Sequence, residues 1–205
     1  MGKIFYIMGK SATGKDTIYK ELSLRFQDSL KNIVSYTTRP IREGETQGVE
    51  YFFVTEAEAG KLQQEGKVIE LREYQTVKGP WKYFTVSDDQ IDLSKNDYLV
   101  IGTLESYLSM RKFFGEETMI PVYIEVEDGN RLERAVSRER QQVAPNFAEV
   151  CRRYLADEQD FSEDKLIQAG ITKRFENKTL ETAVSEIASY IVSCLDGAKG
   201  GTLYG

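Results

Sequence analysis

A glycine-bounded loop near the start of the chain limits the possible folds more than any other feature. The loop follows an apolar run from Lys3 to Met8, which is typical of a buried strand. Apolar residues at helical spacing come after it, at Ile18, Leu22 and Phe26. A strand, a glycine-bounded loop and a helix in this order are the context that a phosphate-binding loop requires. The sequence therefore predicts an α/β fold whose first strand leads into a phosphate site.

The loop has the pattern G-x-x-x-x-G-K and runs through Gly9, Lys10, Ser11, Ala12, Thr13, Gly14, Lys15, Asp16 and Thr17. Its two glycines allow a tight turn that brings backbone N–H groups close to phosphate oxygens, and the helix N-terminus adds partial positive charge. Lys15 can reach the terminal phosphates as a point charge. Asp16 stands where Ser or Thr is usual, and Thr17 supplies a hydroxyl one position later. We expect Thr17, partly through water, or the Asp16 carboxylate to hold Mg²⁺, which prefers oxygen ligands.

The charge balance and the missing histidine exclude several classes of function. The 205 residues carry a net charge of −6, so we expect no nucleic-acid or membrane partner. The absence of histidine excludes Ser-His-Asp and Cys-His catalysis and histidine zinc sites. Cys151 and Cys194 are far apart, and no apolar stretch is long enough for a signal peptide or a membrane span. We therefore expect a cytoplasmic protein that binds small molecules as a monomer or a homodimer.

Two kinds of segment alternate along the chain. Residues 35–85 are rich in short strands and turns, whereas the flanking segments alternate strands with helices, as in a parallel sheet. We interpret residues 35–85 as a subdomain inserted into a core. Residues 131–153 are rich in arginine and form a third unit. The core then comprises residues 1–34, 86–130 and 154–205.

Local patterns predict several helices. Thr55 and Glu58 form a capping-box pattern at the start of a helix in the inserted segment. The core should resume with a helix near Ser87 to Leu93 and end with an amphipathic helix over Leu180 to Leu195, beyond which we expect a frayed end from Gly197.

Two further motifs are specific to a family. The block S-Y-T-T-R-P-I-R-E-G-E occupies residues 35–45, and G-V-E-Y-F-F follows at residues 48–53. With the phosphate loop, these motifs resemble guanylate kinase over nearly the whole chain. The resemblance implies a P-loop three-layer α/β fold with an ATP-binding parallel-sheet core, an inserted mixed-β subdomain that binds the nucleoside monophosphate, and a helical lid. It implies ATP and Mg²⁺ as cofactors, GMP or dGMP as acceptor, and ADP and GDP as products.

The resemblance also assigns roles to residues in all three units. The loop from Gly9 to Thr17 would bind the phosphates of ATP, and Asn177 would lie near the adenine. The acceptor's phosphate would be bound by Ser35, Arg39, Arg42, Tyr51 and Tyr83. Glu70 would accept hydrogen bonds from the guanine N1 and N2 edge, and Thr85 would contact O6. In the lid, Arg134 and Arg138 would contact the ATP phosphates and Arg153 the transferring group, so that Lys15 and these three arginines would be the catalytic residues. Arginine pairs suit a phosphate dianion because each guanidinium binds it bidentately.

The chain departs from the family pattern at several positions. The strand that usually ends in Asp-x-Asp reads L-V-I-G-T here and ends at Thr103. Lys10 and Ala12 replace the usual Pro and Gly of the loop, and Glu139 stands where the lid usually has Gly.

Two alternatives remain open at this point. The loop junction and the strand over residues 97–102 resemble ribose 1,5-bisphosphate phosphokinase, whereas the set of Arg39, Arg42, Tyr51 and Glu70 suits a nucleotide acceptor better. A non-catalytic guanylate-kinase-like module that binds phosphorylated peptides is the second alternative. Such modules usually lose the phosphate loop, so its retention here favours an enzyme.

Overall fold

The computed structural model describes residues 2–76 and 79–200. Its core is a parallel sheet with the strand order β2-β7-β1-β8-β9. The first strand of the sequence is therefore central, as a buried apolar run requires. The strands are β1 (Ile4–Met8), β2 (Leu30–Asn32), β7 (Asp97–Ile101), β8 (Met119–Glu125) and β9 (Arg174–Glu176).

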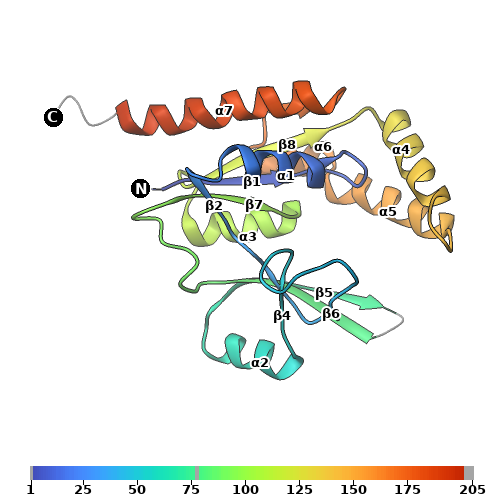
Figure 1. Cartoon of the computed structure of the whole chain (residues 1–205), viewed down its shortest axis with the longest axis horizontal. Coiled ribbons are helices and arrows are strands. Elements are labelled where there is room, and N and C mark those ends of the chain that lie inside the picture. The colour runs from blue at the N-terminus through green and yellow to red at the C-terminus, as the bar shows by residue number, and fades with distance from the viewer. Residues whose placement is uncertain (1, 77–78, 201–205) are drawn as a thin grey trace.

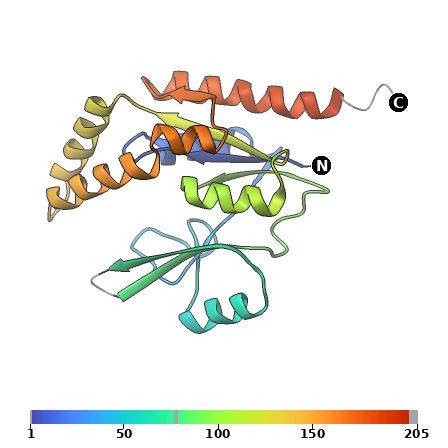
Figure 2. The same ribbon diagram turned by 180° about the vertical axis from the view of Figure 1, so that it is seen from behind.

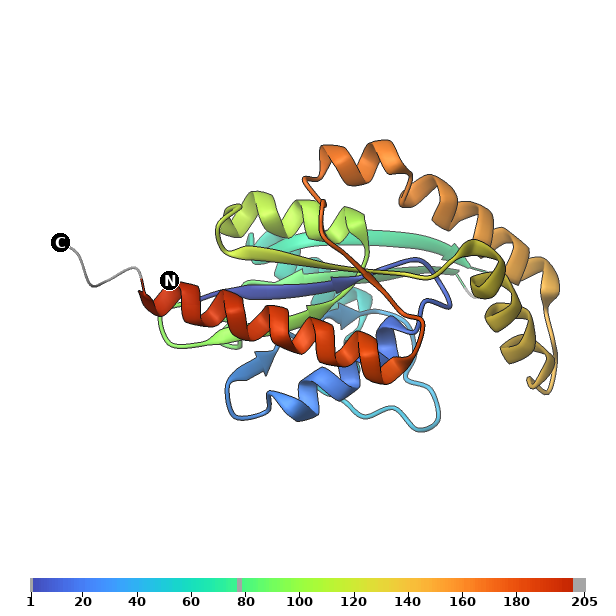
Figure 3. The ribbon, with the colours of Figure 1, turned by 90° about the horizontal axis from the view of Figure 1, so that it is seen from above.

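Helices cover both faces of this sheet (Figure 1). Strand β1 alternates between them: Ile4 and Tyr6 pack with α3 (Leu104–Phe114) and α6 (Glu163–Gln168), whereas Phe5 and Ile7 pack with α1 (Lys15–Arg25) and α7 (Leu180–Gly200). Seen from above, α7 lies along the sheet (Figure 3). These three layers confirm the predicted α/β fold class. The end that we expected to fray falls partly within α7, which continues to Gly200, and partly in residues 201–205, which lie outside the described residues.

The inserted segment forms a second, smaller sheet below the core (Figure 2). Its order is β4-β3-β6-β5, with one parallel and two antiparallel pairings. Helix α2 (Glu56–Gln64) packs on it through Ala59, which is buried with Phe84 and Val86. The predicted capping box of α2 is confirmed: the Thr55 hydroxyl accepts from the Glu58 amide, and the Glu58 carboxylate accepts from the Thr55 amide. The strands are β3 (Tyr36–Thr37), β4 (Phe52–Phe53), β5 (Val68–Thr76) and β6 (Gly79–Val86).

The arginine-rich segment forms two helices at the end of the molecule opposite to the C-terminal end of α7 (Figure 1). These are α4 (Asp128–Arg140) and α5 (Phe147–Asp160), so the helices extend beyond the 131–153 range expected for the lid. Glu139 accepts a hydrogen bond from the backbone N–H of Asn146 at 2.7 Å. Its carboxylate therefore ties together the two ends of the α4–α5 connection.

The helix predicted near Ser87 to Leu93 is wrong. This stretch is a series of turns, because polar side chains bond to backbone groups in place of a helical ladder. The side-chain Oε1 of Gln90 accepts from the Val34 backbone N–H at 2.8 Å, and the Leu93 backbone carbonyl accepts from the Gly2 backbone N–H at 2.8 Å. The turns thus attach the connection between the two sheets to the core.

Among the described residues, no helix is both long and apolar enough to cross a membrane.

Candidate functional site

The phosphate loop connects β1 to α1 in the geometry that its glycines predict. Gly14 caps α1 in the left-handed conformation, with φ 84°, and a Cβ there would lie 2.6 Å from the Asn177 side-chain nitrogen. A Cβ on Gly9 would lie 2.4 Å from the Ile124 carbonyl oxygen, which belongs to the backbone of β8. Neither position can carry a side chain without movement of its neighbours. Asn177, whose amide donates to the Thr13 carbonyl oxygen at 2.8 Å, therefore lies against the loop.

Ala12 is strained within this loop. Its φ is 64°, and it is the one residue other than glycine with a positive φ among residues 2–76 and 79–200. A left-handed conformation costs an L-residue about 1–2 kcal/mol because its Cβ crowds the backbone. At this position glycine would therefore be more favourable than alanine.

Replacing Ala12 with glycine should raise the free energy of unfolding by about 1 kcal/mol, since relief of strain outweighs the greater freedom of glycine in the unfolded chain. Ala57, exposed in α2, offers a matched control, because Ala57→Gly should lower stability by about 1 kcal/mol. Chemical denaturation of the three proteins measures both effects. Equal destabilisation by the two substitutions would show that Ala12 is not strained.

Lys15 is the first residue of α1, and its ammonium group is lightly held. Among the described residues it pairs with Asp16 alone, at 3.6 Å, and the Asp16 side chain is 78% exposed. An exposed ion pair of this kind contributes little to stability. The ammonium group is thus free to exchange this partner for a phosphate. Thr17 is exposed on the first turn of the same helix.

Arg39 is the most deeply buried of the residues expected to bind the acceptor's phosphate. Its guanidinium, 3% exposed, donates to both oxygens of Glu45, at 2.6 and 2.7 Å, and lies 5.2 Å from the ring centroid of Tyr51. These hydrogen bonds raise the pKa of Arg39 above its ordinary value. Glu45 also accepts from the backbone N–H of Arg42, whose side chain is exposed. Tyr83 lies beside Tyr51, with its ring centroid 5.6 Å away.

The Glu45 carboxylate should make stability depend on pH. The hydrogen bonds from Arg39 lower its pKa from the ordinary 4.5 to about 2. A carboxyl group with a depressed pKa in the folded state stabilises the protein above pH 4.5, and this contribution is lost as the pH falls towards 2. We expect Glu45→Gln to lower the free energy of unfolding at pH 6 and to have a smaller effect at pH 3, where part of the contribution has already been lost.

Denaturation at the two pH values measures this change, with Glu43→Gln in the same exposed loop as the control. A Glu45→Gln effect of equal size at pH 6 and pH 3 would mean that Glu45 is not held by Arg39.

Glu70 and Thr85, which are expected to contact the acceptor's base, form a hydrogen-bonded chain with Ser35, which is expected to contact its phosphate. The hydroxyl oxygens of Ser35 and Thr85 lie 3.5 Å apart, and the Thr85 hydroxyl donates to Glu70 at 2.8 Å. Glu70 in turn accepts from Arg72, which also donates to the Thr103 hydroxyl at 3.3 Å. The chain links the subdomain sheet to the end of β7 in the core. Thr103 caps α3 there by accepting from the Ser106 amide.

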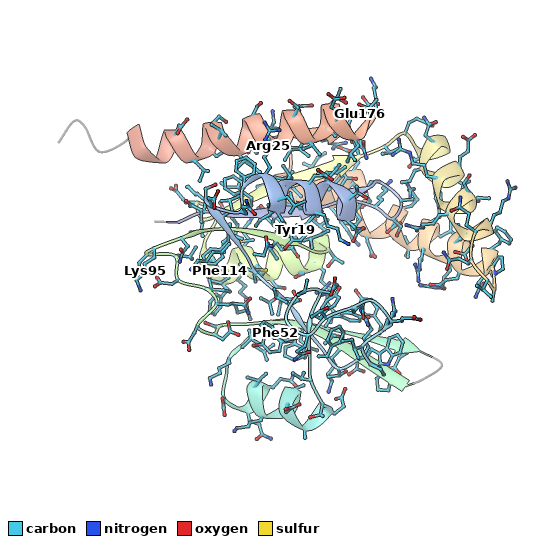
Figure 4. The ribbon with its side chains drawn as sticks, viewed as in Figure 1. Tyr19, Arg25, Phe52, Lys95, Phe114 and Glu176 are labelled. Atoms are coloured by element: carbon cyan, nitrogen blue, oxygen red, sulfur yellow. The ribbon has the colours of Figure 1, made fainter. Side chains whose placement is uncertain are left out.

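A cavity of about 430 Å³ lies between α1 and the inserted subdomain. Its lining includes Asp16 at the end of the phosphate loop, Tyr19 one turn later, and Ser35 and Tyr51 from the subdomain. Figure 4 shows Tyr19 on the side of α1 that faces the subdomain carrying Phe52. The structure therefore brings the phosphate loop and part of the expected acceptor site to the same cavity.

The three arginines expected in the lid lie near the phosphate loop. Arg134 donates to the Asn177 carbonyl oxygen at 3.0 Å. Arg138 and Arg153 line a cavity of about 120 Å³ together with Ser11 of the loop. The Arg153 side chain is held by Glu149, at 2.7 Å, and is 57% exposed. All three arginines thus lie around the phosphate loop, but none of them contacts Lys15.

The sequence did not predict the charged contacts that join the phosphate loop and Arg131 to helix α5. Arg131, 1% exposed, pairs with Asp157 and Glu158 of α5. Asp157 accepts from the Ser11 amide at 2.8 Å, and Glu158 pairs with the Lys10 ammonium group at 2.7 Å. The Lys10 side chain is therefore engaged with the C-terminal part of α5. Arg131 also pairs with Asp128, three positions before it, at 3.1 Å. Its two partners on α5 lie 26 and 27 positions away, so nothing in the sequence reveals its burial among the exposed arginines around it.

The signal for Arg72 was present in the sequence. It follows Glu70 by two positions in an apolar strand, and residues two apart lie on the same face of a strand. The opposite charges of the two side chains would have indicated a pair on that face.

Comparison with known proteins identifies relatives of this chain. The family model "Guanylate kinase" matches residues 1–193. The guanylate kinase of Thermotoga maritima is 35% identical over 122 residues, which cover 59% of this chain and 57% of that protein. The guanylate kinase of Mycoplasma pneumoniae is 46% identical over 61 residues, which cover 30% of this chain and 26% of that protein. The matched segments thus span about a quarter to three fifths of the curated relatives' own length.

A solved structure has the same fold. The crystal structure of guanylate kinase from Anaplasma phagocytophilum matches with a TM-score of 0.62 and 19% sequence identity, and the match covers 94% of this chain and 85% of that one. At this identity the likeness supports the arrangement of the sheets and helices.

Proposed function

We propose that this chain, which belongs to the guanylate kinase family, transfers the γ-phosphoryl group of ATP to GMP or dGMP and produces ADP and the nucleoside diphosphate. The observation that carries the proposal is the cavity that Asp16 of the phosphate loop shares with Ser35 and Tyr51 of the subdomain. A phosphoryl group held at the loop would there face an acceptor held by the subdomain. Phosphoryl transfer needs little covalent chemistry from a protein, so positioning and charge neutralisation can supply most of the rate.

The roles on the donor side follow from the loop. Backbone N–H groups from Gly9 to Thr17 would hold the ATP phosphates, and the Lys15 ammonium group would neutralise charge at the terminal phosphate. Arg134 and Arg138 would contact the same phosphates when the lid closes, and Arg153 would leave Glu149 to meet the transferring group. Asn177, fixed against the loop by Thr13, would lie beside the adenine.

The roles on the acceptor side follow from the subdomain. Arg39, Arg42, Tyr51, Tyr83 and Ser35 would hold the phosphate of GMP, since guanidinium and hydroxyl groups suit a dianion. Glu70 would accept from the guanine N1 and N2 edge, and Thr85 would contact O6. We propose that residues 35–85 act as the acceptor-binding unit, residues 131–153 as the lid, and the remaining segments as the ATP-binding core.

The loop fits a magnesium ion that is held mainly by the nucleotide. No group of three acidic, histidine or cysteine side chains that could hold a metal occurs among the described residues. Mg²⁺ in kinases is usually bound through one or two protein oxygens, substrate phosphates and water, and it neutralises phosphate charge there. Asp16 lines the cavity and offers a carboxylate, so it would hold the ion, directly or through water. The exposed Thr17 hydroxyl would assist through water.

An assay of ADP release with ATP and Mg²⁺ tests the proposal. The acceptors are GMP, dGMP, AMP, UMP and ribose 1,5-bisphosphate, measured side by side. We expect turnover with GMP and dGMP. Turnover with ribose 1,5-bisphosphate alone would contradict the proposal and favour ribose 1,5-bisphosphate phosphokinase, an alternative that the relatives' names do not support. Binding of ATP without turnover on any acceptor would favour a non-catalytic module.

A further inference from the structure

Arg72 has no role in the function proposed above, yet it is built into the acceptor site. It lies on β5 beside Glu70, and the two side chains are 12% and 2% exposed. Its Nε donates to Glu70 Oε2 at 3.0 Å, one terminal nitrogen donates to Glu70 Oε1 at 3.3 Å, and the other donates to the Thr103 hydroxyl at 3.3 Å. The guanidinium therefore bridges the two positions where the site would meet a base.

The hydrogen bonds of Glu70 leave little room for a base. A carboxylate has about four acceptor positions, two on each oxygen. Oε1 receives the Thr85 hydroxyl and a terminal nitrogen of Arg72, whereas Oε2 receives the Arg72 Nε. With three donors in place among the described residues, one acceptor position remains, on Oε2. Glu70 can therefore accept one N–H from a base without rearrangement.

Thr103 cannot supply the missing acceptor. A hydroxyl has two acceptor positions and one proton to donate. The Thr103 oxygen accepts from Arg72 and from the Ser106 amide, both at 3.3 Å. In this arrangement Thr103 can offer a base its proton and cannot receive an N–H group.

The acceptor positions that remain on Glu70 and Thr103 determine which bases the site can distinguish. Guanine presents N–H groups at N1 and at its 2-amino group on the edge that would face Glu70, and hypoxanthine presents N1–H alone. Adenine has an unprotonated N1, which would place a lone pair against the carboxylate. A site with one free acceptor position satisfies N1–H and leaves the 2-amino group without a protein partner.

We propose that Arg72 is a positioning residue that restricts Glu70 to one base N–H, so that the acceptor site takes 6-oxopurine nucleoside monophosphates with or without a 2-amino group. The site would thus accept IMP as well as GMP and would reject AMP. This inference rests on the proposed function and makes it more specific, because it concerns the same acceptor site. Arg72 acts through Glu70 and need not touch the substrate.

Steady-state kinetics with GMP, IMP and AMP test this inference. We expect the native protein to show kcat/KM values for GMP and IMP within about tenfold of each other, and to use AMP far less. A hydrogen bond to a charged group usually changes affinity by about 10- to 150-fold. A native preference for GMP over IMP of more than 100-fold would therefore overturn the inference while leaving the kinase proposal intact.

Two variants identify Arg72 as the cause. Arg72→Leu should free Glu70 and raise the ratio of GMP to IMP use by about tenfold or more. Thr103→Asp should also raise the ratio of GMP to IMP use, because the new carboxylate would attract Arg72 and accept from the base. This substitution removes no buried charge, and aspartate also caps helices well. Thr103→Ser, which keeps the hydroxyl and the cap, is the matched control and should leave the ratio unchanged. An unchanged ratio in folded Thr103→Asp would contradict the inference.

Calorimetric titration of GMP and IMP into the native protein separates the two proposals. Similar affinities for GMP and IMP, without turnover of either, would support the inference about the base and contradict the proposed activity. Binding of GMP but not IMP, with turnover of GMP, would support the proposed activity and contradict the inference about the base. Failure of both nucleotides to bind would overturn both proposals.

Discussion

Lys15→Met should lower kcat at least 100- to 1000-fold, the loss seen when one electrostatic contact to a developing charge is removed. The ammonium group is the positive charge that α1 places at the end of the phosphate loop, and methionine fills a similar volume without charge. Stability should hardly change, because the partner of Lys15 in this structure is the exposed Asp16. Steady-state kinetics and thermal unfolding measure the two quantities.

Lys112→Met provides the control for this experiment. Lys112 is exposed in the last turn of α3, so its loss should change neither kcat nor stability. Activity that survives in Lys15→Met would show that the phosphate loop has been assigned wrongly. Inactivity combined with a large loss of stability would show that Lys15 supports the fold.

Arg39→Met should reduce both stability and use of the acceptor. Loss of the guanidinium leaves the half-buried Glu45 carboxylate without a positive partner, with only the Arg42 backbone N–H still donating to it, which costs about 3 kcal/mol in the free energy of unfolding. In the proposed role of Arg39, the substitution would also remove charge-assisted hydrogen bonds to the acceptor's phosphate, so KM for GMP should rise by about 10- to 150-fold. Denaturation and acceptor kinetics measure the two effects, and Arg25→Met, at an exposed arginine of α1, is the control.

A double variant separates the two effects of Arg39. Arg39→Met combined with Glu45→Gln should regain much of the lost stability, because no unpaired carboxylate remains. The raised KM for GMP should persist, because the guanidinium is still missing. If KM returned with stability, Arg39 would serve the fold and not the acceptor.

The sequence was most informative where local chemistry determines structure. The glycines at positions 9 and 14 predicted the turn between β1 and α1, and the Thr55 and Glu58 pair predicted the start of α2. Parallel pairing of the core followed from alternation of strands and helices. The helix expected near Ser87 was wrong because polar side chains such as Gln90 bond to distant backbone groups, which no local pattern reveals.

The candidate site was predictable in its motifs and not in its charge pairs. The structure places Ser35, which was expected at the acceptor's phosphate, in one hydrogen-bonded chain with Glu70 and Thr85, which were expected at its base. The contact of Arg72 with Thr103 joins residues 31 positions apart. Such partners depend on how the subdomain packs against the core, so single-sequence patterns do not specify them.

Transfer of labelled phosphate from ATP to GMP tests the central claim most directly. With γ-labelled ATP, Mg²⁺ and protein in excess over nucleotide, the products of a single turnover are separated and identified. The account predicts that the label appears in GDP, with one ADP formed for each GDP, and that Lys15→Met forms none on the same timescale. Label released only as inorganic phosphate, or retained in ATP while GMP is bound, would contradict it.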